Sequence, residues 1–190
     1  MLLLFVFVYN LGIQLSGHMP VPFYLETGFS NSQIGAVSAI FGVAPFLLGV
    51  LVGGWLQLKT GLYSTLVQAS VLKVTAIAGY LLVVIMGVNV YWLSVTMAFQ
   101  SFALGVGTTA LMAFIANITD RRFTATQFAL FTALAALPRA TLTAPAGWLA
   151  TEMGWSMFFL LSALLATPGL VLLLSCKGLF QESARGSKST

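Results

Sequence analysis

The stretch from residue 62 to residue 117 reads LYSTLVQASVLKVTAIAGYLLVVIMGVNVYWLSVTMAFQSFALGVGTTALMAFIAN, and Lys73 is its only charged side chain. A helix that spans a membrane needs ~20 consecutive apolar residues. The break Gly-Val-Asn at 87–89 divides the stretch into two such helices, near 62–86 and 90–117. Because the connection is so short, the second helix must run back beside the first.

The rest of the chain repeats this pattern of long apolar runs separated by short polar breaks. Hydrophobic residues make up 59% of the 190 residues and charged residues 6%, against about 25% charged in soluble domains. We therefore predict an all-α polytopic membrane bundle of six transmembrane helices over 1–175, followed by a polar cytoplasmic tail over 176–190. The first run lacks a basic leader and a cleavage site, so we interpret it as a retained span rather than a signal peptide. The four further spans are expected near 2–25, 33–58, 124–150 and 155–175.

Basic side chains outside the spans fall on one side of this up-and-down path. The only charged residues in the opposite loops are the acidic Glu26 and Glu152. Cytoplasmic loops of membrane proteins carry the excess of Lys and Arg, so both termini are predicted to be cytoplasmic. Because the basic residues gather on the cytoplasmic side of the spans, we do not infer a nucleic-acid partner from the net charge of +4. The basic residues on the cytoplasmic side are Lys59, Arg121, Arg122, Lys177, Arg185 and Lys188.

Small and aromatic residues give further hints about helix packing. Gly35, Gly42 and Gly49 recur every seven residues, and Gly49 with Gly53 forms a G-x-x-x-G pair. Such stripes let helices approach closely in lipid, and packing between helices is the interpretation we favour. Aromatic residues near the predicted helix ends are expected to lie at the membrane interface. They are Trp55, Tyr91, Trp92, Trp148 and Trp155.

Polar residues inside predicted spans are costly and are functional candidates by default. Lys73 and Arg139 lie too deep for their charges to reach the interface easily, and the spans contain no Asp or Glu. Helix carbonyls, a partner domain or an anionic substrate could compensate these charges. We name Arg139 and Lys73 as candidates for binding such a substrate, with polar contacts from Asn10, Gln14, Gln100 and Gln127. The lone histidine, His18, is an interfacial residue in the simplest interpretation and a proton-coupling group in the sharper one.

The sequence lacks the motifs of the known intramembrane proteases. An intramembrane aspartyl or zinc protease needs paired carboxylates or an H-E-x-x-H motif, and the spans contain neither. A rhomboid-type protease needs a G-x-S-G motif, which is missing as well. The single cysteine, Cys176, excludes an intrachain disulfide. We expect no enzyme activity, no cofactor and no metal site.

The last three predicted spans carry a specific resemblance. The segment GVGTTALMAFIANITDRRFTATQFALFTALAALPRATLTAPAGWLATEMGWSMFFLLSALLATPGLVLLL resembles the AmpG-type muropeptide permeases of the major facilitator superfamily. Looser agreement extends over nearly the whole chain. The resemblance implies that 1–175 correspond to the C-terminal six-helix half of a bacterial inner-membrane permease. Such a permease imports anionic muropeptides by alternating access around a midplane site, with proton symport as an option.

Several positions depart from this family as we align them. Gln100 stands where the family places Glu, Asn10 where it places Lys, Ile13 where it places Asp, and Lys73 where it has a neutral residue. Leu58 replaces the acid of the superfamily loop signature. Two alternatives therefore stay open. The chain could be a truncated or degenerate half that acts only as a membrane interaction partner, or a half-size permease that homodimerises through its glycine stripe.

Overall fold

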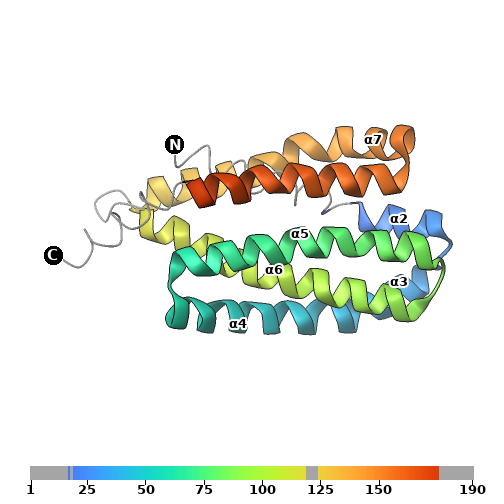
Figure 1. The fold of residues 1–190 in the computed structure, drawn as a ribbon, viewed down its shortest axis with the longest axis horizontal. Helices are drawn as coiled ribbons and strands as arrows, with labels where there is room; N and C mark the ends of the chain where they lie inside the picture. The colour runs from blue at the N-terminus through green and yellow to red at the C-terminus, as the bar shows by residue number, and fades with distance from the viewer. Residues whose placement is uncertain (1–16, 18, 119–123, 176–190) are drawn as a thin grey trace.

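The structure is a computed structural model, and it describes residue 17, residues 19–118 and residues 124–175. Throughout this part of the chain all regular structure is helical. The elements are α2 (Pro20–Thr27), α3 (Asn31–Val37), the π-helical turn η1 (Ser38–Gly42), α4 (Val43–Thr60), α5 (Leu62–Met86), α6 (Val90–Ile118) and α7 (Thr124–Ser175). They lie side by side in one elongated bundle (Figure 1).

The chain reverses direction where the sequence predicts it. Gly61 between α4 and α5, Gly87 between α5 and α6, and Gly154 inside α7 have φ values of 84°, 71° and 75°. Residues with a Cβ rarely adopt such values, whereas glycine does so without steric cost. At Gly154, α7 therefore folds back into two antiparallel arms, 124–153 and 155–175, seen in orange and red in Figure 1. The predicted breaks near 59–61, 87–89 and 152–155 are confirmed.

Within the described residues, four helical segments are long and apolar enough to cross a membrane: Asn31–Thr60, Leu62–Met86, Val90–Asn117 and Pro145–Gly169. The last of them contains the reversal at Gly154 and thus combines parts of both α7 arms. Most of the predicted first span lies outside the described residues, and α2 covers its end. An all-helical bundle with several candidate spans is confirmed, whereas the count of six spanning helices stays a prediction.

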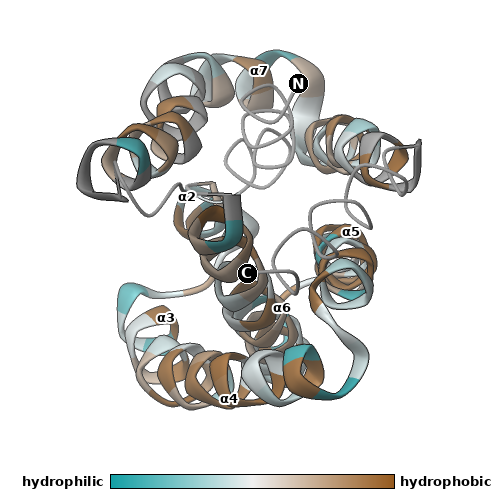
Figure 2. Ribbon diagram, turned by 90° about the vertical axis from the view of Figure 1, so that its left-hand side faces the viewer, coloured by the Kyte–Doolittle hydropathy of each residue, from teal (hydrophilic) through white to brown (hydrophobic). Residues whose placement is uncertain are grey.

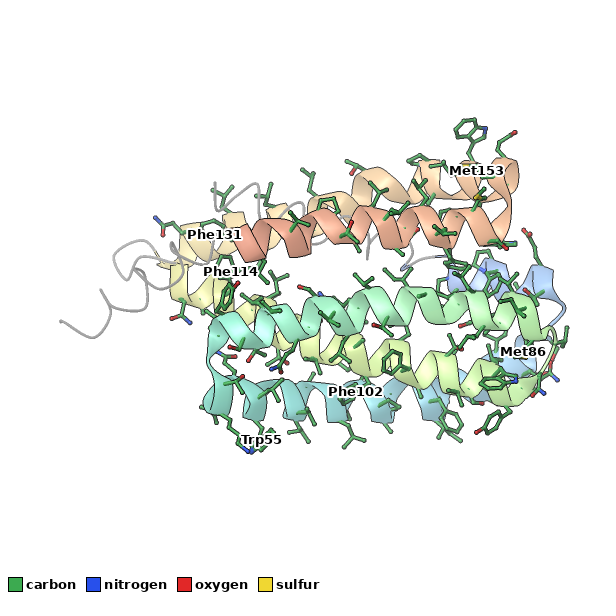
Figure 3. All side chains as sticks on the ribbon, viewed as in Figure 1. Trp55, Met86, Phe102, Phe114, Phe131 and Met153 are labelled. Atoms are coloured by element: carbon green, nitrogen blue, oxygen red, sulfur yellow. The ribbon has the colours of Figure 1, made fainter. Side chains whose placement is uncertain are left out.

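Hydrophobic residues lie on the outward as well as the inward faces of the helices, as the brown segments in Figure 2 show. Large apolar side chains on α4 such as Leu47, Leu51 and Leu58 are 55%, 69% and 90% exposed. A helix that is apolar all round suits a lipid environment. Trp55 points outward at the end of α4, opposite the end that holds Met86 and Met153 (Figure 3). Trp55, Tyr91 and Trp148 are all more than half exposed, as expected for interfacial residues.

The second predicted span contains a local irregularity that the sequence did not reveal. Ser30 caps α3: its hydroxyl accepts from the Gln33 backbone N–H, and the Gln33 side chain accepts from the Ser30 backbone N–H. The helix then widens into η1 just before Pro45. Proline has no N–H to donate to the carbonyl four residues earlier, here Phe41. Helices commonly accommodate such an interruption by a local change of winding.

The glycine stripe joins two helices of the same chain. A Cβ on Gly53 would lie 3.1 Å from the Val106 Cα, and one on Gly49 would run into the Phe102 carbonyl. The Thr109 hydroxyl donates to the Val50 carbonyl at 3.4 Å across the same contact. The packing interpretation is confirmed for these two glycines. A homodimer that used these two glycines would first have to displace α6, and the dimer alternative stays a prediction.

Candidate functional site

Lys73 lies near the middle of α5, about 16 Å from its first residue by helical rise. Buried residues recur along α5 every three or four positions, and Lys73 belongs to this stripe at 6% exposure. Its side chain runs against Gly107 of α6: a Cβ on Gly107 would overlap the Lys73 Cε and lie 2.6 Å from Nζ. The ammonium therefore lies at the interface of α5 and α6. Whether Lys73 also faces a wet cavity or a partner, as the sequence predicts, stays a prediction.

Gln100 belongs to the buried face of α6. Residues on this face alternate in steps of three and four, the spacing of one helical stripe. Its Oε1 is buried and accepts no hydrogen bond from the described residues. An unsatisfied buried carbonyl oxygen is costly, so Gln100 is a polar group ready to accept a donor. The buried neighbours on the stripe are Leu93, Thr96, Ala103, Gly107, Ala110 and Phe114.

The two polar positions lie within a few helical turns of each other. Gln100 and Gly107 are seven residues apart on α6, which places them on one face, roughly 10 Å apart along the axis. Gly79 of α5 lies level with Thr96, because a Cβ on Gly79 would be 3.8 Å from the Thr96 Cγ2. Counting along the antiparallel pair, Lys73 and Gln100 both fall in the central part of the bundle. The structure therefore brings these two predicted site residues to one interface.

The other predicted site residues are placed less completely. Gln127 is half-buried near the start of α7. Arg139 belongs to the first arm of α7, and its side chain lies outside the described part. Asn10, Gln14 and His18 also lie outside the described residues. Their roles stay predictions.

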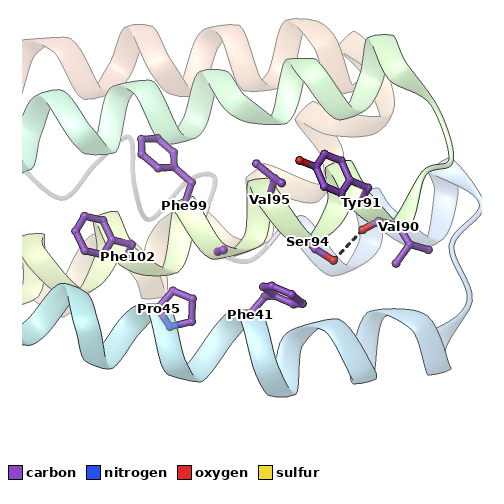
Figure 4. Close-up of a pocket in the computed structure, with 9 residues that line it drawn as sticks. Phe41, Pro45, Val90, Tyr91, Ser94, Val95, Phe99 and Phe102 are labelled. Carbon is purple, nitrogen blue, oxygen red and sulfur yellow. Dashed lines mark hydrogen bonds between the residues drawn. The ribbon is translucent and has the colours of Figure 1, made fainter.

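An apolar groove opens between two walls. One wall is formed by η1 and the start of α4, and the other by the first turns of α6. The volume of the groove is about 550 Å³, and it contains none of the predicted site residues. Figure 4 shows Phe41 and Pro45 on one wall and Phe99 and Phe102 on the other. The Ser94 hydroxyl donates to the Val90 carbonyl at 2.8 Å, so even this polar group is satisfied within its own helix. The groove offers no charge to an anion.

An aromatic cluster at the Gly154 end of the bundle was not predicted. The rings of Tyr80 and Phe159 stack with centroids 4.6 Å apart, and Phe23 meets Phe159 edge-on at 5.0 Å. Trp155 donates its indole N–H to Glu26 at 2.8 Å, which ties α7 to α2. Trp155, which is predicted to be an interfacial residue, is half-buried and also packs into this cluster. The recurrence of aromatics at 155, 158 and 159 was the available signal.

Comparison with known proteins agrees with the fold. The chain matches the Major Facilitator Superfamily over residues 1–188. It is 33% identical to the anhydromuropeptide permease of Escherichia coli (strain K12) over 178 residues, which cover 93% of this chain and 36% of that protein. A protein of Rickettsia conorii named as a candidate AmpG transporter is 30% identical over 173 residues, 91% of this chain and 42% of that protein.

The chain thus spans roughly two fifths of the length of the curated relatives it matches. The resemblance to AmpG-type permeases is confirmed at the level of a distant homologue over most of the chain. Together with the all-helical bundle and its candidate spans, the match over nearly all residues shows that this chain belongs to the Major Facilitator Superfamily, a family of membrane transporters and not of enzymes.

Proposed function

We propose that this chain forms one six-helix half, over residues 1–175, of a permease that imports anhydromuropeptides or a similar anionic cell-wall fragment across the bacterial inner membrane. The observation that carries the proposal is the 33% identity to an anhydromuropeptide permease over 93% of the chain. Transport proceeds by alternating access, in which two halves rock around a site near the midplane. The second half is an N-terminal six-helix half or a second copy, since the chain is much shorter than its relatives.

Anion binding is assigned to the two basic residues in the predicted spans. Lys73 and Arg139 supply positive charge, and a substrate carboxylate forms charge-assisted hydrogen bonds with such groups. Gln100 and Gln127, with Asn10 and Gln14, supply neutral polar contacts. Support comes from the position of Lys73 near the middle of α5 and from the free acceptor on Gln100. His18 is proposed as the proton-coupling group because its unperturbed pKa of about 6.5 lies near physiological pH.

The proposed orientation places both termini and the tail 176–190 in the cytoplasm. It rests on the basic residues at one side of the spans, among them Lys59, whose ammonium lies 4.7 Å from the Trp55 ring centroid. The opposite ends of the helices then carry Glu26 and Glu152 outside. This arrangement follows the positive-inside rule.

Uptake of radiolabelled anhydromuropeptide into proteoliposomes containing the chain tests the proposal. We expect uptake above empty liposomes, and a loss of roughly 10- to 150-fold in kcat/KM on Lys73→Met, since a charge-assisted hydrogen bond is worth about 1.5–3 kcal/mol. Lys59→Met is the matched control, because Lys59 lies at the end of α4 and is predicted to bind no substrate. Equal effects of the two substitutions would contradict the role given to Lys73.

A second candidate is a half-transporter that acts only as a membrane interaction partner. The observation that favours it is the burial of Lys73 against α6. The uptake experiment separates the two candidates. Uptake that stays at the level of empty liposomes, both for the chain alone and for the chain with its second half, would favour the interaction partner.

A further inference from the structure

We propose that Gly107 is a positioning residue that holds the Lys73 ammonium at the α5–α6 interface. Its consequence for anion transport rests on the function proposed above. The inference itself starts from the space that Gly107 leaves open. The three atoms nearest to a Cβ at position 107 all belong to Lys73.

Glycine at position 107 is favoured by the lack of space for a side chain there and not by its backbone conformation. It lies inside the regular helix α6 and is not among the glycines with positive φ, so any residue could adopt its backbone. A Cβ added there would overlap the Lys73 Cε, lie 2.6 Å from Nζ and 3.1 Å from Cδ. Real Cβ atoms do not approach other atoms so closely. The end of the lysine side chain therefore occupies the volume that an alanine methyl group would fill.

A glycine of α5 at the same interface shows how specific the contact is. Gly79 lies on α5, and a Cβ there would meet the Thr96 Cγ2 at 3.8 Å, an ordinary van der Waals contact. A methyl group at position 79 is therefore tolerated. The same methyl group at position 107 must move the lysine head. The two glycines form a natural pair of test and control sites within one interface.

The position of the ammonium matters because a lysine side chain is long and flexible. Its four methylene groups let the charge take several directions, and the notch at Gly107 selects one of them. In that direction the charge lies on the face of α6 that also carries Gln100, two turns away. The direction of the charge relative to Gln100 therefore depends on the absence of a side chain at position 107.

The test is a double-substitution cycle on the full chain in proteoliposomes, with Gly107→Ala, Lys73→Ala and both together. The melting temperature of the purified chain and the KM and kcat of anhydromuropeptide uptake are measured for each. Because the end of the lysine side chain can turn aside, Gly107→Ala is expected to lower the melting temperature only slightly in the presence of Lys73 and to leave it unchanged when position 73 is Ala. It is also expected to raise KM roughly as much as Lys73→Ala does, with no further rise in the double variant.

Gly79→Ala is the matched control and should leave both the melting temperature and KM unchanged. The proposal is overturned if Gly107→Ala changes the melting temperature equally in both backgrounds, or if the two substitutions raise KM additively. Should Gly107→Ala fail to fold, recovery of folding in the double variant would support the notch, and failure of both would overturn it. Absence of uptake by the wild-type chain, both alone and together with its second half, would refute the proposed function, while the melting temperatures would still decide the role of Gly107.

Discussion

Gly49 of α4 and Gly105 of α6 lie so close that a Cβ on Gly49 would stand 3.2 Å from the Gly105 Cα. Conversely, a Cβ on Gly105 would run into the Phe46 carbonyl and lie 2.9 Å from the Val50 backbone nitrogen. These neighbours are backbone atoms, which cannot turn aside as a side chain can. The two helices are therefore in direct backbone contact, the arrangement that small residues permit in membranes.

Gly105→Ala should separate α4 from α6 and destabilise the chain. Overpacking of this kind costs typically 1–3 kcal/mol, and we expect a clear fall in the melting temperature followed by circular dichroism in detergent. Gly54→Ala is the control, because no described atom lies within 4 Å of a Cβ at that position. A melting temperature for Gly105→Ala equal to that of Gly54→Ala would show that the two helices do not meet at this point.

Gly154→Ala should weaken the reversal inside α7. Gly154 has φ 75° and ψ 158°, a region that is essentially restricted to glycine and costs other residues about 1–3 kcal/mol. The expected result is a lower melting temperature and a faster proteolytic cut near the turn. The control is Gly147→Ala, because Gly147 belongs to the same helix and no described atom lies within 4 Å of a Cβ at that position. This control should be neutral or stabilising, because alanine favours helix, and a loss as large as that at Gly154 would refute the argument.

The sequence predicts the path of this bundle well because hydropathy breaks coincide with glycines that reverse the chain. Gly61, Gly87 and Gly154 fall within the predicted connections. The π-helical turn before Pro45 was not predicted, since a proline in a span signals an interruption but not its form. The site could be predicted only in part. Residue type and depth identify Lys73 as unusual, but its contact with Gly107 depends on the relative register of α5 and α6, which no local pattern encodes.

Trp155→Phe should loosen the tie between α7 and α2. The substitution keeps an aromatic ring near Phe159, whose centroid lies 6.0 Å from that of Trp155, but it removes the donor to Glu26. Because Glu26 is exposed, the lost hydrogen bond is worth only about 1 kcal/mol, which corresponds to a fall of roughly 2–4 °C in melting temperature. Trp148→Phe, at an exposed position, serves as the control. An equal effect at both tryptophans would mean that ring size and not the hydrogen bond is responsible.

Accessibility of single cysteines can decide the orientation of the bundle. In a Cys176→Ser background, Val88→Cys places a thiol at the exposed connection between α5 and α6, and Thr60→Cys places one at the end of α4. The positive-inside rule puts the first of these outside and the second, next to Lys59, inside. A membrane-impermeant maleimide added to intact cells should therefore label Val88→Cys and leave Thr60→Cys unmodified until the membrane is permeabilised. The reverse pattern would invert the topology and contradict the orientation inferred from the basic connections.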